Sequence, residues 1–350
     1  MEPKLFTIGD GERHSLSDSE SSPSWLPRYI QAIDDRVSGL FGAGSSPLDV
    51  AVREALQGGK RIRAVLALLW CEAVSGGYET ALPVAAAYEM AHAAALVQDD
   101  ILDDSGLRRG EKSIIGKHGL RLAILTSNML LAQVPREIAG YGSIESGRNI
   151  LTKLFDLLGE SFGAAVLGEF LDLEMADRDP VSQSDYEYMI RMKTGALVAA
   201  SSASGVVVGG RADGDVTLRT AYAFGEWLGM AYQVHDDLLD IIGDEEALGK
   251  PAFADIKGGK KNIVLIHALE KSSEEDRFFL RELLGKRGEF GDSEIRRARA
   301  LLSTHESIEY ARGVASAYAE NARKLLDTTD VGDTKSKLME LSYYLASRKY

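Results

Sequence analysis

The sequence predicts an all-α protein, a bundle of roughly a dozen helices in a single domain. Three observations predict this class. Apolar residues recur at intervals of about 3.6 residues over most of the chain. Only 8 of the 350 residues are proline, so long helices can continue without interruption. No stretch shows the alternating pattern or the turn signal of paired strands. The breaks between periodic stretches are also too short to link two domains.

The periodic stretches follow a segment of different composition. Residues 1–24 contain six serines and five acidic residues, which predicts a poorly ordered tail because few apolar side chains are present to form a core. Residues 25–350 are predicted to form the folded domain. Its five longest helices are expected at residues 61–74, 81–104, 151–176, 184–210 and 219–244. Shorter helices follow to the C-terminus, among them residues 307–327.

The composition excludes several classes of protein. The formal net charge of -13 argues against non-specific binding of nucleic acid. The single cysteine, Cys71, excludes an internal disulfide and is typical of a cytoplasmic protein. The longest apolar stretch, residues 82–97, is interrupted by Glu89 and His92 and is too short to cross a bilayer. We therefore expect a cytoplasmic protein with no transmembrane segment and no secretory signal.

Two stretches, each at the end of an apolar helix, share the spacing Asp-Asp-x-x-Asp. Their acidic residues are Asp99, Asp100 and Asp103 in the first run, and Asp236, Asp237 and Asp240 in the second. Positions four apart lie on one helix face, so each run forms a patch of carboxylates. Two charges about 5 Å apart repel by about 1 kcal/mol in water and by several times more inside a protein. Magnesium ions would remove this repulsion, because carboxylate oxygens are ligands that magnesium prefers.

The alternative interpretation of each run is a solvated helix end, which is the usual fate of a single group of charges. Two copies of the same spacing, each after a strongly apolar helix, favour metal binding. A calcium-binding EF-hand is excluded because neither run has oxygen ligands spaced along a twelve-residue loop.

Basic residues lie close to both runs in the sequence, as expected if the metal ions share a phosphate with the protein. The candidates are Lys60 and Arg63, with Arg61 as a weaker one, then Arg108, Arg109, Lys193 with Thr194, Lys250, Lys257, Lys260 and Lys261. Guanidinium groups bind phosphate oxygens in a fork, and lysines act as point charges. His92 lies two helical turns before Asp99 on the same face. Each of these residues taken singly is more often a surface charge or, for His92, a core residue.

The order of the motifs resembles the trans-isoprenyl diphosphate synthases (polyprenyl synthetases), and in particular geranylgeranyl diphosphate synthases. The shared motifs, over about residues 55–265, are G-G-K-x-x-R, D-D-x-x-D with L-R-R-G, K-T, Q-x-x-D-D-x-x-D and G-K-P-x-x-x-D. The resemblance implies the isoprenoid synthase fold, in which helices surround a deep central cavity and the two aspartate runs face each other at its mouth. It also implies a homodimer.

The resemblance implies a reaction as well: head-to-tail condensation of isopentenyl diphosphate with an allylic diphosphate (dimethylallyl, geranyl or farnesyl). It implies about three Mg²⁺ ions, with Asp99, Asp103 and Asp236 as ligands. The six aspartates and Lys193 would be catalytic. The implied contacts to isopentenyl diphosphate are Lys60, Arg63, His92 and Arg109. The implied contacts to the allylic diphosphate are Arg108, Lys193, Thr194, Gln233, Lys250 and Lys260.

The resemblance also bears on product length. In this family the residues four and five positions before the first aspartate form the floor of the product tunnel, and here they are Ala95 and Ala94, with Ala91 one turn further down. The small side chains predict an open floor and a product of at least twenty carbons. Simple packing of an alanine-rich helix is the alternative interpretation.

The sequence departs from the family pattern in a few places. Ser127-Asn128 replace a usual Gly-Asp, Glu169 replaces a usual glutamine before Asp172, and Asn262 lies where a K-x-T-L-P pattern is usual.

Two other functions stay open at this point. A class I terpene cyclase would not need the residues that bind a second diphosphate. A non-catalytic subunit of a heteromeric synthase would be expected to have lost aspartates.

Overall fold

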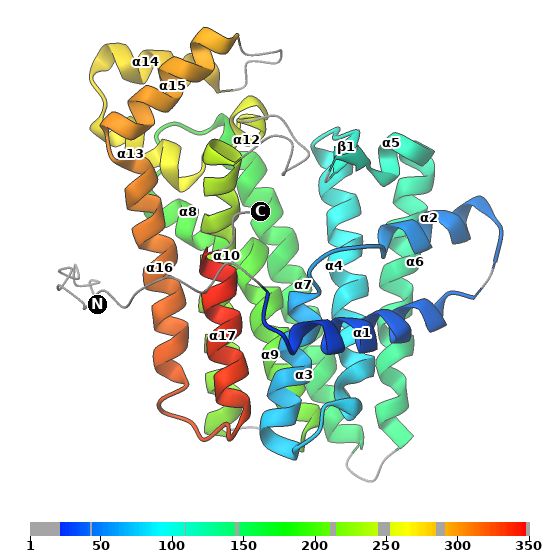
Figure 1. The fold of residues 1–350 in the computed structure, drawn as a ribbon. Coiled ribbons are helices and arrows are strands. Elements are labelled where there is room, and N and C mark those ends of the chain that lie inside the picture. The colour runs from blue at the N-terminus through cyan, green and yellow to red at the C-terminus, as the bar shows by residue number, and fades with distance from the viewer. Residues whose placement is uncertain are drawn as a thin grey trace.

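The computed structural model describes residues 22–42, 44–108, 110–143, 147–210, 215–243, 253–284 and 291–347, and the statements below concern these ranges. Helices dominate this part of the chain (Figure 1). The elements are α1 (Leu26–Leu40), α2 (Pro47–Ala55), α3 (Ile62–Ser75), η1 (Glu79–Ala81), α4 (Leu82–Leu102), β1 (Leu107–Arg108), β2 (Glu111–Lys112), α5 (Ile114–His118), α6 (Leu120–Ile138), η2 (Ala139–Ser143), α7 (Gly147–Asp177), α8 (Gln183–Ile190), η3 (Arg191–Gly195), α9 (Ala196–Val208), α10 (Val216–Ile242), α12 (Ala254–Lys257), α13 (Ile263–Lys271), α14 (Glu274–Leu283), α15 (Asp292–Thr304), α16 (Ser307–Leu325) and α17 (Thr334–Ser347).

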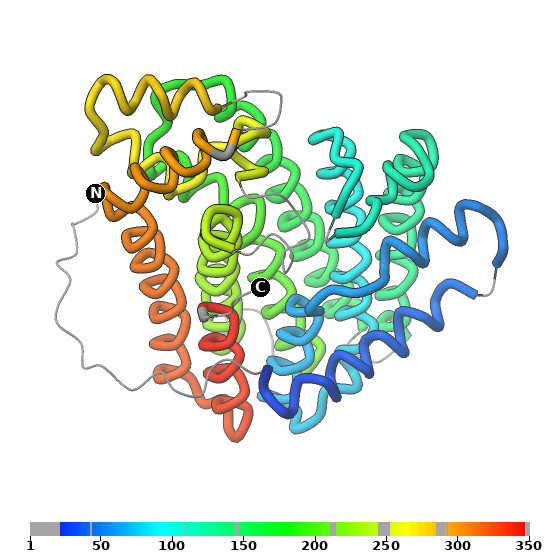
Figure 2. Tube along the Cα trace, turned by 45° about the horizontal axis from the view of Figure 1, so that its top comes forward, coloured from blue at the N-terminus to red at the C-terminus, as the bar shows by residue number. Residues whose placement is uncertain are grey.

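The centre of the bundle is formed by α3, α4 and α9, whose sequences are almost entirely apolar. Every residue of α9 is buried, and this helix packs against α3, α7 and α10. Figures 1 and 2 show the long helices running side by side, with the two N-terminal helices, in blue, lying across them. One core group contains Trp70, Tyr88 and Phe224, and a second contains Tyr186 and Phe253. Each fully buried large side chain contributes about 1.5–3 kcal/mol through the hydrophobic effect.

Local signals explain where several helices begin. The Ser46 hydroxyl accepts a hydrogen bond from the N–H of Asp49, and the Asp49 carboxylate accepts one from the N–H of Ser46, which forms a capping box before α2. Ser182 and Asp185 form the same box before α8. The Asn262 side chain accepts a backbone N–H at 3.1 Å and caps α13. This departure from the family pattern therefore has a structural role in the fold.

A glycine sets the closest approach between two central helices. A Cβ atom at Gly205 on α9 would lie 2.1 Å from the carbonyl oxygen of Ala67 on α3. Because no real Cβ makes such a contact, any larger residue would push α9 away from α3. The glycine thus permits the tight packing that holds the centre of the bundle together.

The five long helices predicted from the sequence are confirmed, with small shifts of their ends, and one is interrupted. The sequence predicts a continuous helix over residues 184–210, whereas the chain forms α8, the single π-helical turn η3 and then α9. The antiparallel pair β1–β2 is not predicted either, because strands of two residues leave no alternating pattern.

One stretch, Glu79–Leu102, has the length and apolar composition of a membrane-crossing helix, and it is the only one among the ranges given above. It comprises η1 and α4, and 67% of its most apolar 18-residue window is buried inside the protein. A core helix has these same properties.

Candidate active site

The first aspartate run lies at the C-terminal end of α4. Asp99 and Asp100 belong to its last turn, and Asp103 is the residue at which the helix ends. Arg108, on β1, binds both of the first two carboxylates: its Nη2 donates to Asp99 at 2.6 Å and its Nε donates to Asp100 at 2.8 Å. The end of the helix adds partial negative charge to that of the carboxylates. Arg108 compensates part of this charge.

Lys193 brings a second cation to the same place. Its ammonium nitrogen lies 3.3 Å from Asp99, 2.8 Å from Glu169 and 2.7 Å from Asp172, the last two being one turn apart on α7. Lys193 projects from the π turn η3, an element that often occurs at functional sites. Gly168 allows this arrangement, because a Cβ there would lie 2.1 Å from the backbone nitrogen of Lys193.

The second run lies near the C-terminal end of α10 and is buried more deeply. Asp237 is 7% exposed, and both of its carboxyl oxygens are hydrogen-bonded. The Tyr186 hydroxyl donates to one at 2.5 Å, and Gln233 Nε2 donates to the other at 2.9 Å. Gln233 Oε1 in turn accepts the Thr194 hydroxyl at 2.7 Å. Asp240 is 1% exposed and accepts backbone N–H groups from the segment around the start of α12.

The structure brings the two runs to one site. Lys193 and Thr194 are adjacent on η3; the first contacts Asp99 of the first run, and the second contacts Gln233, one turn before the second run. A further link crosses between them, because Lys260, which follows α12, donates to Asp103 at 2.6 Å. Figure 1 shows β1 and α12 at the same end of the bundle. The four helical segments α4, α10, α12 and η3 therefore surround one acidic site.

Burial and neighbouring charges set the pKa values of these groups. Burial raises the pKa of Asp99, but the three nearby cations outweigh this effect and hold it well below its usual range. Burial raises the pKa of Asp100 to about 6, against the opposing effect of Arg108. Burial raises the pKa of Asp237 to about 8, against the opposing effect of its hydrogen bonds from Tyr186 and Gln233. Burial lowers the pKa of Lys193, but the surrounding carboxylates outweigh it and the pKa lies well above the usual range.

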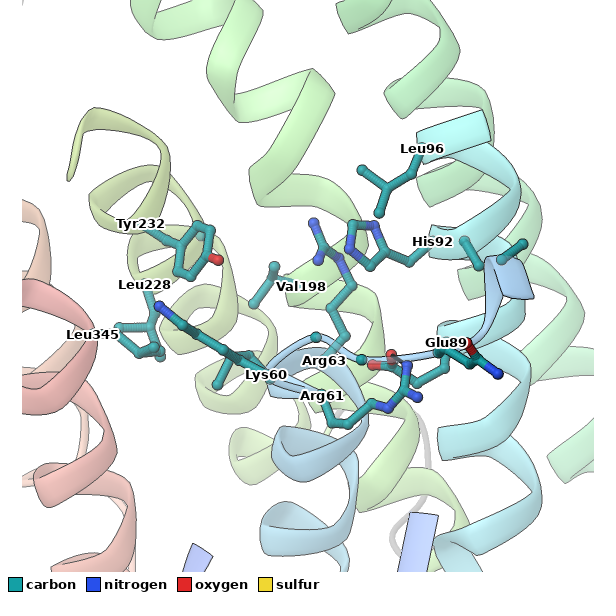
Figure 3. Close-up of a pocket in the computed structure, with 17 residues that line it drawn as sticks. Lys60, Arg61, Arg63, Glu89, His92, Leu96, Val198, Leu228, Tyr232 and Leu345 are labelled. Atoms are coloured by element: carbon teal, nitrogen blue, oxygen red, sulfur yellow. Dashed lines mark hydrogen bonds and ion pairs between the residues drawn. The ribbon is translucent and has the colours of Figure 1, made fainter. Parts of the chain in front are cut away.

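A basic pocket lies between the start of α3, α4 and α10 (Figure 3). Lys60, Arg63 and His92 line it, and Tyr232, one turn before Asp236 on α10, closes the opposite side. The buried Nε of Arg63 has no hydrogen-bond partner in the described part of the chain. Burial lowers the pKa of this guanidinium, against the opposing charge of neighbouring acidic groups that include Asp236. A buried cation with an unused N–H group is suited to bind an anion that enters from solvent.

Two other cations near the predicted set stabilise the fold instead. Arg61 donates to Asp34 at 2.8 Å and to Glu89 at 3.2 Å. Its guanidinium is therefore bound by acidic residues outside the two aspartate runs. Lys261, one of the candidate phosphate ligands near the second run, donates to three backbone carbonyls at the C-terminal end of α7. Its side chain therefore caps a helix, and burial lowers its pKa.

The donor set fits magnesium ions that bind together with a phosphate. The side chains of Asp99 and Asp103 are 21% and 25% exposed, whereas Asp100, Asp237 and Asp240 are buried. Within the described ranges, no three His, Cys, Asp or Glu side chains are arranged to hold a metal ion by themselves. Magnesium is usually bound through one or two carboxylates, water and substrate phosphates. The accessible oxygens of the two runs supply such a partial set.

The small residues before the first aspartate run line the interior of the bundle. Ala91 and Ala94 are buried, and Ala95 is partly exposed. Tyr88, two turns below Ala95, is fully buried, and its hydroxyl lies 2.9 Å from that of Ser204 on α9. The three positions predicted to form the tunnel floor therefore carry small side chains, and Tyr88, one turn before Ala91, contacts the next helix through its hydroxyl.

The remaining departures from the family pattern also have positions in the structure. Ser127 is buried on α6 and donates to the Ala94 carbonyl at 3.3 Å, which ties α6 to α4. Asn128 is exposed beside it. Glu169 lies at the acidic site itself, where it pairs with Lys193.

Two predicted residues, Arg109 and Lys250, lie outside the described residues. The motifs also leave out Tyr186, which contacts Asp237 directly. One signal could have pointed to it: Tyr186 lies seven residues before Lys193, which is two helical turns along the same face.

The fold and the site together define a largely helical protein in which an acidic site adjoins a basic pocket. The chain matches the family model "Polyprenyl synthetase" over residues 46–302, and it belongs to this family. It is 34% identical over 328 residues to a short chain isoprenyl diphosphate synthase of Methanothermobacter thermautotrophicus, covering 93% of this chain and 98% of the relative. It is 34% identical to a geranylgeranyl diphosphate synthase of Sulfolobus acidocaldarius, covering 90% and 94%. Among solved structures, a geranylgeranyl pyrophosphate synthetase from Pyrococcus horikoshii superposes with a TM-score of 0.83 at 30% identity, covering 92% and 97%.

Proposed function

We propose that this protein is a magnesium-dependent trans-prenyltransferase that condenses isopentenyl diphosphate head-to-tail with an allylic diphosphate. Its product has twenty carbons, as geranylgeranyl diphosphate, or more. The allylic primer is dimethylallyl, geranyl or farnesyl diphosphate. Relatives of the same length that carry the names of such synthases support this assignment.

One observation carries the proposal: an acidic site and a basic pocket adjoin along α4 and α10. Asp99 and His92 lie two turns apart on α4, and Asp236 and Tyr232 lie one turn apart on α10. Two diphosphates therefore have separate places, one beside the carboxylates and one beside Lys60 and its neighbours. A condensation of two diphosphate substrates needs this arrangement.

The roles of the residues follow from charge and position. Asp99, Asp103 and Asp236 would hold about three Mg²⁺ ions, which, when bound, neutralise the negative charge that grows on the departing pyrophosphate. Lys193 and Lys260 are placed to donate to the same pyrophosphate once a substrate competes with their carboxylate partners. The other residues proposed to contact this diphosphate are Arg108, Thr194, Gln233 and Lys250.

The second substrate is held by the basic pocket. Lys60, Arg63 and His92, together with Arg109, would bind the isopentenyl diphosphate and direct its double bond toward the allylic carbon. Apolar residues of the pocket wall, such as Leu96, exclude water that would otherwise quench the carbocation. After the new carbon–carbon bond forms, a proton leaves, and the released pyrophosphate is the proposed acceptor.

Incubation of the purified protein with MgCl₂, labelled isopentenyl diphosphate and each of the three primers in turn tests this function. We expect products of at least twenty carbons by chromatography after dephosphorylation. A class I terpene cyclase would instead convert one diphosphate to a cyclic hydrocarbon without isopentenyl diphosphate. A non-catalytic subunit would elongate no primer, and that result would refute the proposal.

We further propose that the protein is a homodimer that forms through α6 and α7. These consecutive helices carry large apolar side chains that are exposed to solvent: Leu120, Ile124, Leu125, Met129, Phe155, Val166, Leu167, Phe170 and Leu173. So many exposed large apolar side chains on two helices are unusual on a monomer, and a second copy of the same helices would cover them.

Light scattering after size-exclusion chromatography tests the dimer. Phe170→Asp should shift the mass toward that of the monomer, whereas the matched change Phe278→Asp on α14, where the phenylalanine is also exposed, should not. A monomeric native protein would contradict the proposal.

The free thiol of Cys71 supports a cytoplasmic location.

A further inference from the structure

Tyr186 is a buried tyrosine outside every motif that defines the site. It lies on α8, is 1% exposed, and packs in the second core group. Its hydroxyl donates to Asp237 at 2.5 Å, a length typical of a strong O–H···O hydrogen bond to a carboxylate. Because burial of a hydroxyl is costly without a partner, this bond fixes the orientation of both side chains.

The bond is the first of a chain that crosses from the core to the acidic site. The second oxygen of Asp237 accepts Gln233 Nε2 at 2.9 Å. Gln233 Oε1 accepts the hydroxyl of Thr194 at 2.7 Å. Thr194 is adjacent to Lys193, whose ammonium group contacts Asp99. Each group in the chain therefore has its rotamer set by the one before it.

Asp237 differs from the aspartates that fit a metal ion. Both of its oxygens are hydrogen-bonded within the protein, and its side chain is buried, whereas those of Asp99 and Asp103 are partly exposed. The middle aspartate of the second run is thus placed to orient Gln233.

We propose that Tyr186 is a positioning residue for the allylic diphosphate, acting through Asp237 and Gln233 on the Thr194 hydroxyl. The inference rests on the proposed function of this site, in which Gln233 and Thr194 contact that diphosphate. The hydrogen-bonded groups lie on α8, α10 and η3, whereas Lys60, Arg63 and His92 of the basic pocket lie on α4 and at the start of α3. We therefore expect Tyr186 to affect the allylic diphosphate more than isopentenyl diphosphate.

Tyr186→Phe removes only the hydroxyl, and Tyr318→Phe is the matched control. Tyr318 belongs to the same core group, is 8% exposed and does not contact Asp237. We expect Tyr186→Phe to lower kcat/KM for the allylic diphosphate about tenfold, the loss typical of one buried hydrogen bond. The KM for isopentenyl diphosphate should change less than twofold, and Tyr318→Phe should leave both constants unchanged. Thermal unfolding should show that both variants are folded.

Two further measurements separate positioning from a general effect on the fold. Calorimetric titration with inorganic pyrophosphate and MgCl₂ should show about tenfold weaker binding to Tyr186→Phe than to the native protein. In a double-mutant cycle with Gln233→Leu, the second substitution should add little, because both interrupt one chain. Additive losses, equal losses for both substrates, or native pyrophosphate affinity would each overturn the inference. If the native protein binds pyrophosphate but elongates no primer, the proposed function fails while the titration still decides the role of Tyr186.

Discussion

The depth of the proposed product tunnel follows from the geometry of α4. With a rise of about 1.5 Å per residue, Ala95 lies about 6 Å and Tyr88 about 16 Å below Asp99 along the helix. One isoprene unit, four carbon–carbon bonds long, extends about 5 Å. In the proposed tunnel, about three units fit below the one held at the aspartates before the product reaches Tyr88, whose hydroxyl contacts that of Ser204 and which we propose as the floor. This corresponds to about twenty carbons.

Ala95→Phe should move the floor upward by about 10 Å, which is the distance between the two residues along the helix. Room then remains for about one unit below the aspartates, so growth should stop at ten to fifteen carbons. The same shift is expected for Ala94→Phe. Conversely, Tyr88→Ala should open the floor and lengthen the product by at least one unit.

Chromatography of the dephosphorylated products, with dimethylallyl diphosphate as primer, measures these shifts. Thermal unfolding is needed alongside it, because an added ring in a packed interior costs about 1–3 kcal/mol. A folded, active Ala95→Phe protein whose product length equals that of the native protein would refute the assignment of this stripe to the tunnel. Unchanged product length in Tyr88→Ala would refute the position of the floor.

Three other perturbations have defined outcomes. Arg63→Met should raise the KM for isopentenyl diphosphate at least tenfold in steady-state assays and raise that for the allylic substrate much less, because Arg63 lines the basic pocket and, within the described ranges, forms no ion pair with the carboxylates of the first run. Removal of magnesium with EDTA should abolish elongation, and added MgCl₂ should restore it; full activity in EDTA would contradict the metal assignment. The variant Asp236→Asn should need a higher magnesium concentration to reach half of its maximal rate. For the metal-free protein, the pKa of Asp237 is raised to about 8 by burial, so the folded state keeps a proton that the unfolded state releases near pH 4. The free energy of unfolding of the native protein should therefore fall by about 1.4 kcal/mol per pH unit within this window, or about 3 kcal/mol from pH 5 to 7.5. Urea titrations at several pH values measure this fall relative to the variant Asp237→Asn. If the stability of both proteins changes with pH in the same way, Asp237 does not hold this proton.

The secondary structure and the acidic half of the site could be predicted from particular residues. Apolar periodicity in residues 61–74 and 81–104 predicts helices that the structure shows as α3 and α4. These signals are local, since a helix satisfies its hydrogen bonds within a few residues of sequence. The repeated Asp-Asp-x-x-Asp spacing predicts carboxylate patches for the same reason.

The partners of those carboxylates could not be predicted in this way. Nothing local in "GKKN" shows that Lys260 reaches Asp103 while the adjacent Lys261 caps α7. The π turn that aims Lys193 at three carboxylates, and the close approach that Gly168 permits, depend on how α7 packs against η3.

By itself, the sequence determined which residues are helical, which helix ends are acidic and which cations accompany them, because helix formation and charge spacing are properties of neighbouring residues. Only the tertiary structure decided that Arg61 serves the fold, that Arg63 is left with an unused buried N–H group, and that Tyr186 holds Asp237. These outcomes depend on helices that are far apart in the chain and meet only when their apolar faces are buried together.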